Sequence, residues 1–220
     1  MRKIPFISVV LFSLFVGLGF GQEVGYKVVC FGDSITKRGY PDILAKRLGI
    51  EVINAGVAGH TSTQGLRRMK KDVLEHKPNL VIVFFGTNDL RVDSNKHVPV
   101  KEYRKNLEQI AKACAEIKAE VVFCTPPPIN EKTYFERHKR SDYDAHGGLS
   151  KLLGDEQEAV RTFGKEKRIT VVDLAKELLK NPEWMHKDGV HPSPKGNVLI
   201  AEAVMRAIMP ILPDRVKSAE

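Results

Sequence analysis

The feature that most constrains the fold is a run of six apolar residues, Leu80 to Phe85, followed directly by Gly86-Thr87-Asn88-Asp89. No polar side chain alternates with the apolar ones, so both faces of this strand must be buried, as they are in the middle of a parallel sheet. Parallel strands are joined by long crossovers, usually helices. The run therefore predicts an α/β protein with polar residues at the carboxyl end of a central strand.

The same order of strand, glycine and short polar side chains occurs near the beginning of the chain. Residues 26–31 form a β-branched and aromatic run that stops at Gly32 and continues as Asp33-Ser34. The chain must turn there and expose Ser34 at the carboxyl edge of the sheet, where open α/β folds bind their ligands. Ser34 is therefore a candidate nucleophile, and an ordinary turn or helix cap is the alternative.

Apolar periodicity predicts five strands separated by helices, which gives a three-layer α/β/α sandwich with a five-stranded parallel sheet. The expected strands are 26–31, 51–53, 80–85, 120–125 and 169–172, and the expected helices are 40–48, 62–76, 99–118, 149–167, 173–179 and 194–209. Residues 126–148 follow neither period, so we expect an irregular loop that borders the pocket. Its aromatics Tyr134 and Phe135 either stack on substrate or pin the loop.

Residues 1–21 have the pattern of a secretory signal peptide, which leaves residues 22–220 as one domain. Arg2 and Lys3 precede a largely apolar stretch over 4–20, and Gly19-Phe20-Gly21 is a small-x-small cleavage site. We therefore expect an exported protein, periplasmic or extracellular. The stretch is long for a cleaved leader, so an uncleaved anchor stays open as the alternative.

The basic surplus does not indicate nucleic-acid binding. The net charge is +8, of which Arg2 and Lys3 contribute two, and the remaining basic residues alternate with acidic ones along the predicted helices. This distribution is typical of solvated helix faces. We expect no nucleic-acid partner, and no stable membrane association once the leader is cleaved.

The cysteines and the acidic loop residues predict neither a disulfide nor a cofactor. Three cysteines, an odd number, lie in apolar segments and are expected to be buried, unpaired and unreactive: Cys30, Cys114 and Cys124. Asp142 and His146 lie close together in sequence, with Asp144 between them, but in an irregular loop we interpret them as solvated. No metal is assigned.

Near the C-terminus, Asp188 and His191 stand three residues apart in a loop that contains Gly189 and ends at Pro192. This spacing lets the carboxylate accept a hydrogen bond from Nδ1–H and leaves Nε2 free to take a proton. Alone, the pair is equally compatible with a structural, salt-linked histidine. Together with Ser34 it supplies a nucleophile, a base and a carboxylate that orients the base.

Three candidate oxyanion donors follow the first three predicted strands: the backbone N–H groups of Ser34 and Gly59 and the side-chain amide of Asn88. Taken singly, Gly59 is more simply an ordinary loop glycine and Asn88 a turn residue. Their occurrence together with the Ser34, Asp188 and His191 set favours acyl-transfer chemistry.

Four blocks of the chain resemble the SGNH, or GDSL-type, hydrolase superfamily: Gly32-Asp33-Ser34, the loop 54–61, Gly86-Thr87-Asn88-Asp89, and Asp188-Gly189-Val190-His191-Pro192. The resemblance implies Ser34 as nucleophile, Gly59 and Asn88 as oxyanion-hole residues, His191 as base and Asp188 as its orienting carboxylate. It also implies the flavodoxin-like strand order 2-1-3-4-5. His60 departs from the pattern, since many relatives carry Asp there, and we interpret it as a solvated loop residue rather than a substrate contact.

The sequence thus predicts an exported serine esterase in which 22–220 is an SGNH hydrolase domain. The expected substrate is a small-molecule or polysaccharide acyl ester, with short-chain O-acetyl groups on carbohydrate as the first choice. A lysophospholipase or thioesterase is the enzymatic alternative, and a non-catalytic carbohydrate- or envelope-binding module on the same fold is the other. The oligomeric state is left open.

Overall fold

The computed structural model describes residues 25–217, so the predicted leader over 1–21 lies outside the described residues. The strands form one parallel sheet in the order β2-β1-β3-β4-β5, which confirms the predicted class and the implied strand order. They are β1 (Lys27–Gly32), β2 (Glu51–Gly56), β3 (Leu80–Phe84), β4 (Glu120–Cys124) and β5 (Thr170–Val172).

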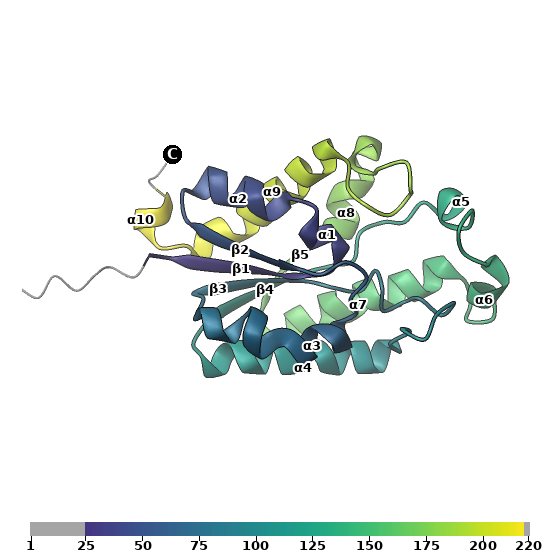
Figure 1. Cartoon of the computed structure of the whole chain (residues 1–220), viewed down its shortest axis with the longest axis horizontal. Coiled ribbons are helices and arrows are strands. Elements are labelled where there is room, and N and C mark those ends of the chain that lie inside the picture. The colour runs from purple at the N-terminus through teal and green to yellow at the C-terminus, as the bar shows by residue number, and fades with distance from the viewer. Residues whose placement is uncertain (1–24, 218–220) are drawn as a thin grey trace, which may run out of the picture.

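Helices cover both faces of this sheet, which makes the three layers visible in Figure 1. One face carries α2 (Tyr40–Leu48), α8 (Leu174–Leu179) and α9 (Pro194–Ile208), and the other carries α3 (Ser62–Asp72), α4 (Val100–Glu116) and α7 (Leu149–Lys167). The shorter elements are α1 (Ser34–Lys37), α5 (Glu131–Tyr134), α6 (Arg140–Asp144), α10 (Asp214–Lys217) and 3-10 turns at Leu74–His76, Pro182–Trp184 and Met209–Ile211.

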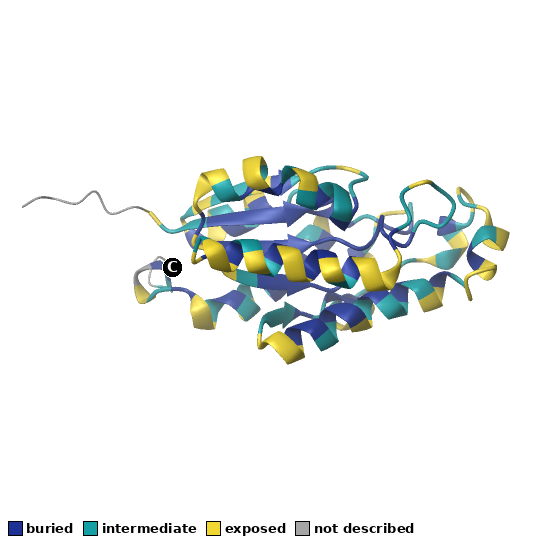
Figure 2. Ribbon diagram, turned by 90° about the horizontal axis from the view of Figure 1, so that it is seen from below, coloured by how far each residue is buried: buried dark blue, intermediate teal, exposed yellow. Residues whose placement is uncertain are grey.

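The middle strands are buried on both faces, as their uninterrupted apolar sequence requires. Every side chain of β3 is at most 1% exposed, and Figure 2 shows the sheet buried between helices whose outer faces are exposed. On one face Phe31 packs edge-to-face against Phe85, with ring centroids 5.0 Å apart. Each such side chain contributes about 1.5–3 kcal/mol when it is removed from water. The sheet is thus a firm platform for the residues at its carboxyl edge.

Glycines end β1 and follow β3 because no side chain fits at those positions. A Cβ on Gly32 would lie 2.4 Å from the carbonyl oxygen of Phe84, and Gly86 has a φ of +127°. The chain can therefore leave the sheet abruptly at both points. The N–H of Asp33 donates to the same Phe84 carbonyl, at 3.3 Å, which ties the turn before Ser34 to the central strand.

The second strand is longer than its sequence predicts. Residues 54–56, expected as part of a loop, continue β2 and pair with residues 30–32 of β1. Pairing with a central strand outweighs the weak strand propensity of Asn, Ala and Gly. Only residues 57–61 form a loop, so Gly59 is held close to the end of the sheet. The helix that follows is shorter than expected, because it ends at Asp72 and a 3-10 turn continues to His76.

The segment 126–148 is not the irregular loop that was expected, since it contains α5 and α6, beyond the carboxyl ends of the strands (Figure 1). Its aromatics form a small core of their own in which Tyr134 is 2% and Tyr143 0% exposed. Their hydroxyls are 2.7 Å apart, and Tyr143 donates to Asp93 Oδ1 at 2.8 Å. Tyr134 therefore pins this segment, as the alternative interpretation held, and does not face a substrate.

The three cysteines are buried and free, as expected from their apolar surroundings. Burial raises the pKa of the Cys30 and Cys114 thiols to about 12, which makes a thiolate at either position costly. Over residues 25–217, no helix combines the length and apolar character needed to cross a bilayer. Within the same residues, no group of three or more His, Cys, Asp or Glu side chains is placed to hold a metal ion.

Candidate active site

Ser34 is the first residue of α1, immediately beyond the carboxyl end of β1. Asp33 caps this helix, because its Oδ1 accepts from the N–H of Ile35 at 2.8 Å. Asp33 is completely buried, so the surrounding protein interior holds this capping side chain in place. The strand, the glycine and the cap together hold the Ser34 hydroxyl above the sheet.

The structure brings Ser34, His191 and Asp188 into one line. Ser34 Oγ lies 2.9 Å from His191 Nε2, and His191 Nδ1 lies 2.7 Å from Asp188 Oδ2. With the ring proton on Nδ1 and donated to Asp188, Nε2 accepts from the serine hydroxyl. A hydroxyl, an imidazole and a carboxylate aligned in this way are the arrangement by which serine hydrolases generate a nucleophile.

A braced turn carries Asp188 and His191. The N–H of His186 donates to the carbonyl of His191 at 2.8 Å, and the N–H of Ser193 donates to the carbonyl of the buried Trp184 at 2.7 Å. From the other side, Arg137 donates to the carbonyl of Asp188. The segment 126–148 therefore supports the turn that positions the histidine, although it was expected to border the pocket.

The environment of Asp188 keeps its carboxylate ionised. Burial by itself raises the pKa, but the backbone N–H of His191 at 2.9 Å, the His191 ring and the N–H of Val190 at 3.0 Å together hold the pKa well below its usual range. Oδ1 accepts both backbone bonds, and Oδ2 faces the imidazole. Asp188 is thus placed to fix the orientation of the His191 ring through the contact between Oδ2 and Nδ1 at 2.7 Å.

Two backbone N–H groups near Ser34 Oγ are free to donate. Neither the N–H of Ser34, at the start of α1, nor that of Gly59 donates to another residue between 25 and 217. Gly59 has a φ of +74°, which only glycine adopts readily, so its conformation in the short loop after β2 depends on the residue type. Both residues line the same cavity.

Asn88 carries the third candidate donor and is oriented by two acceptors. Its Nδ2 donates to Asp33 Oδ2 and to the carbonyl of His60, each at 3.2 Å. The backbone of His60 therefore belongs to the site, whereas its half-buried ring does not line the cavity and its Nδ1 has no partner among the described residues. From the sequence, His60 is interpreted as a solvated loop residue, and the contact of its carbonyl with Asn88 was not predicted.

A cavity of about 540 Å³ joins these groups at the carboxyl edge of the sheet. All the predicted site residues except Asp188, which lies behind His191, line it. The lining residues are Ser34, Lys37, Arg38, Ala58, Gly59, Asn88 and His191. Lys37 and Arg38 were not singled out from the sequence, and none of the described residues over 126–148 is among the lining residues.

A buried carboxyl pair beneath the cavity was also missed. Burial, together with the charge of Asp89, raises the pKa of Asp33 to about 7 despite its bond from the N–H of Ile35. Burial likewise raises the pKa of Asp89 to about 6, although Ser62 donates to it through both its N–H and its hydroxyl. Both residues flank predicted site residues in the sequence. Their short, polar side chains gave no sign that they point inward.

The buried carboxyls make stability depend on pH in a defined window. Folding raises the pKa of Asp33 from 3.8 to about 7, so its contribution to the free energy of unfolding is fully present below about pH 4 and is lost as the pH rises toward 7. The loss is about 1.4 kcal/mol per pH unit for one proton. Asp33→Asn should therefore flatten the pH dependence of urea unfolding over this range.

The variant Asp89→Asn is the matched control, because its effect should end near pH 6 rather than 7. Unfolding free energies that keep a constant difference between the wild type and Asp33→Asn from about pH 4 to 7 would contradict the assignment.

The strand order, the serine beyond β1 and the Asp-His turn near the C-terminus together define an SGNH-type hydrolase fold. Residues 30–199 match the GDSL-like lipase/acylhydrolase family, and the chain belongs to this family. The recognition made from the four sequence blocks is thereby confirmed, and the chain is a carboxylic ester hydrolase.

Three relatives cover nearly the whole domain. An arylesterase from Vibrio mimicus is 28% identical over 211 residues, covering 89% of this chain and 94% of the relative. An acetylxylan esterase from Geobacillus stearothermophilus is 27% identical over 202 residues, covering 87% and 85%. The crystal structure of the lipase/acylhydrolase from Enterococcus faecalis aligns with a TM-score of 0.73 at 29% identity, over 86% of this chain and 97% of that one.

Proposed function

We propose that the protein is a serine esterase that removes short acyl groups, above all O-acetyl groups, from carbohydrate. The observation that carries the proposal is the hydrogen-bonded line from Ser34 Oγ through His191 to Asp188, at 2.9 and 2.7 Å, beside two unused backbone N–H donors. A nucleophile, a base and oxyanion donors in one cavity are the requirements of acyl transfer to water.

In the proposed mechanism His191 Nε2 takes the proton of the Ser34 hydroxyl as Oγ attacks the ester carbonyl. The oxyanion is held by the N–H groups of Ser34 and Gly59 and by the Asn88 amide, whose N–H turns from the His60 carbonyl toward it. His191 then gives the proton to the leaving alcohol. A water molecule, deprotonated by His191, attacks the acyl-enzyme and releases the acid and the free serine.

The cavity supports a short acyl group. Ala58 is the one apolar residue among those that line the cavity, so little apolar surface is available to cover a long acyl chain. The similarity to an acetylxylan esterase supports acetyl on carbohydrate as the substrate class. A lysophospholipase or thioesterase acting on long chains needs an apolar groove that this lining does not supply.

A series of p-nitrophenyl esters tests the acyl preference. We expect kcat/KM to gain nothing from acetate to octanoate, within about threefold, because each added methylene stays in water rather than in an apolar pocket. Acetate release from acetylated xylan oligosaccharides, measured enzymatically, tests the carbohydrate assignment. Rates that rise with chain length, with no release from acetylated sugars, would replace this proposal with the lipid or thioester alternative.

The proposal includes export, for which the support is the basic and then apolar sequence of residues 1–21. Expression of the full chain with its leader should give a secreted protein whose N-terminus begins near Gln22. A membrane-bound protein that retains Met1 would favour the anchor instead.

A further inference from the structure

Two exposed cations lie next to the nucleophile. Lys37 ends α1, Arg38 follows it, and both line the cavity that contains Ser34. Neither side chain forms a hydrogen bond or ion pair with another residue in the described part of the chain, although many surface cations of this protein are paired, such as Arg47 with Glu202. Their charges are therefore available to a ligand in the cavity.

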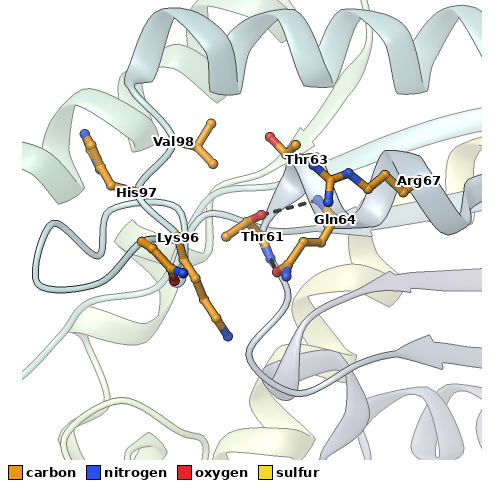
Figure 3. Close-up of a pocket in the computed structure, with 8 residues that line it drawn as sticks. Thr61, Thr63, Gln64, Arg67, Lys96, His97 and Val98 are labelled. Atoms are coloured by element: carbon orange, nitrogen blue, oxygen red, sulfur yellow. Dashed lines mark hydrogen bonds between the residues drawn. The ribbon is translucent and has the colours of Figure 1, made fainter.

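A second cavity of about 470 Å³ lies on the other side of the Gly59 loop and also contains two cations. It is lined by Thr61, Thr63, Gln64, Arg67, Asn95, Lys96, His97 and Val98. Figure 3 shows Lys96 extending toward the loop before Thr61, while Arg67 reaches from α3 toward Gln64. Lys96 Nζ donates to the carbonyl of Gly59 at 3.0 Å, so this ammonium connects the second cavity to the proposed oxyanion loop.

No carboxylate balances these four charges inside the cavities. The chain has 27 acidic residues, yet none of the described ones lines either cavity. Nearby carboxyls are engaged elsewhere: Asp188 with His191, and Asp72 with Arg68. In agreement with a positive potential, the pKa of His60 is lowered, first by burial and then by Arg68 and Lys96. An anionic substrate would be attracted along this whole stretch.

We propose that the substrate is an O-acyl ester on a carbohydrate chain that carries carboxylate groups, as in a polymer of uronic acids. Lys37 and Arg38 hold a carboxylate on the sugar next to the scissile ester, and Lys96 and Arg67 face a carboxylate further along the chain. The inference rests on the proposed function and specifies its substrate class. A neutral acetylated xylan would leave all four cations without a carboxylate partner, since the Lys96 side chain bonds only to the Gly59 carbonyl within residues 25–217.

The test compares two forms of one O-acetylated polyuronate, one with free carboxylates and one with the carboxylates methyl-esterified, and measures acetate release only. Because several weak ion pairs add in one site, we expect kcat/KM to be about tenfold higher on the free-acid form at low salt. The preference should disappear near 1 M salt, where the Debye length falls to about 3 Å.

A matched pair of double variants assigns the preference to the cavity. Lys37→Gln with Arg38→Gln should bring the ratio of the two rates to about one, whereas Lys165→Gln with Lys167→Gln should keep the wild-type ratio. The control removes the same charge from exposed residues at the end of α7. Losing the ratio in both variants would mean that net charge alone causes the preference, which would overturn the proposal.

The failure of this inference can be told from failure of the proposed function. Equal rates on the two polymers, with p-nitrophenyl acetate turnover that depends on Ser34, would overturn the anionic substrate and leave the esterase mechanism standing. Absence of turnover on every ester would overturn both. Acetylated glycans that carry sulfate or phosphate instead of carboxylate are a further arm of the test. Recognition of carboxylate predicts a preference for the polyuronate, whereas general attraction of anions would give equal rates on the carboxylated, sulfated and phosphorylated glycans.

Discussion

Replacing Ser34 with Ala is expected to reduce kcat/KM for p-nitrophenyl acetate by at least about 10⁴, with the fold intact. The hydroxyl is the group that forms the covalent bond, and no other hydroxyl lines the described cavity. Ser34 is partly exposed at the start of α1 and its hydroxyl bonds, among the described residues, only to His191, so thermal unfolding should change little. Hydrolysis of the ester followed at 400 nm, with circular dichroism as the folding check, measures both.

Ser150→Ala is the matched control, since this serine is exposed on α7 and donates only to Glu131. It should keep wild-type activity. A fluorophosphonate probe should label the wild type and the control but not Ser34→Ala. Activity or labelling that survives in Ser34→Ala would remove the nucleophile assignment, and an unlabelled wild type that still binds polysaccharide would favour the binding-module alternative.

Replacing Asp188 with Asn should cost about 10⁴ in kcat while leaving the structure of the turn in place. The amide oxygen can still accept the N–H groups of Val190 and His191, which now bond to Asp188 Oδ1 at 3.0 and 2.9 Å. The other half of the side chain changes from an acceptor to a donor. It no longer holds the proton on Nδ1, and it no longer balances the charge of the imidazolium.

Separate measurement of kcat and KM distinguishes a misoriented His191 from a misfolded protein. KM should change by less than about threefold, because the cavity lining is preserved, and the loss should appear in kcat. Asp142→Asn is the control: this partly exposed carboxylate on α6 pairs with Lys139, and its replacement should leave kcat and KM unchanged. A drop in kcat of less than tenfold for Asp188→Asn would contradict the role of Asp188 in orienting His191.

The fold could be predicted because apolar runs specify buried strands almost without tertiary information. The run from Leu80 to Phe85 contains no polar residue, so the strand must be buried on both faces. A strand buried on both faces lies in the middle of a parallel sheet. The longer β2 could not be predicted in this way. Asn54 and Gly56 have poor strand propensity and enter the sheet only because β1 supplies their partners, a contact that links positions far apart in sequence.

The candidate site was predictable where chemistry and a strand end coincide, as at Ser34 and Asn88. Residues whose function depends on the direction in which the side chain points could not be predicted. Asp33 points down into the protein and Lys37 points out into the cavity, although both belong to the same turn, and nothing in their composition distinguishes the two outcomes. The helices in 126–148 could not be predicted for a related reason. They are too short to show an apolar period, and they depend on a buried pair of tyrosines.

The central claim is that four distant segments of the chain form one acyl-transfer site. A crystal structure of the protein after reaction with diethyl p-nitrophenyl phosphate tests it directly, since the phosphoryl oxygen of the adduct occupies the place of the oxyanion. The predicted result is a bond from phosphorus to Ser34 Oγ, with that oxygen about 2.7–3.1 Å from the N–H groups of Ser34 and Gly59 and from Asn88 Nδ2. An adduct on another side chain, or a phosphoryl oxygen that meets none of these donors, would contradict it.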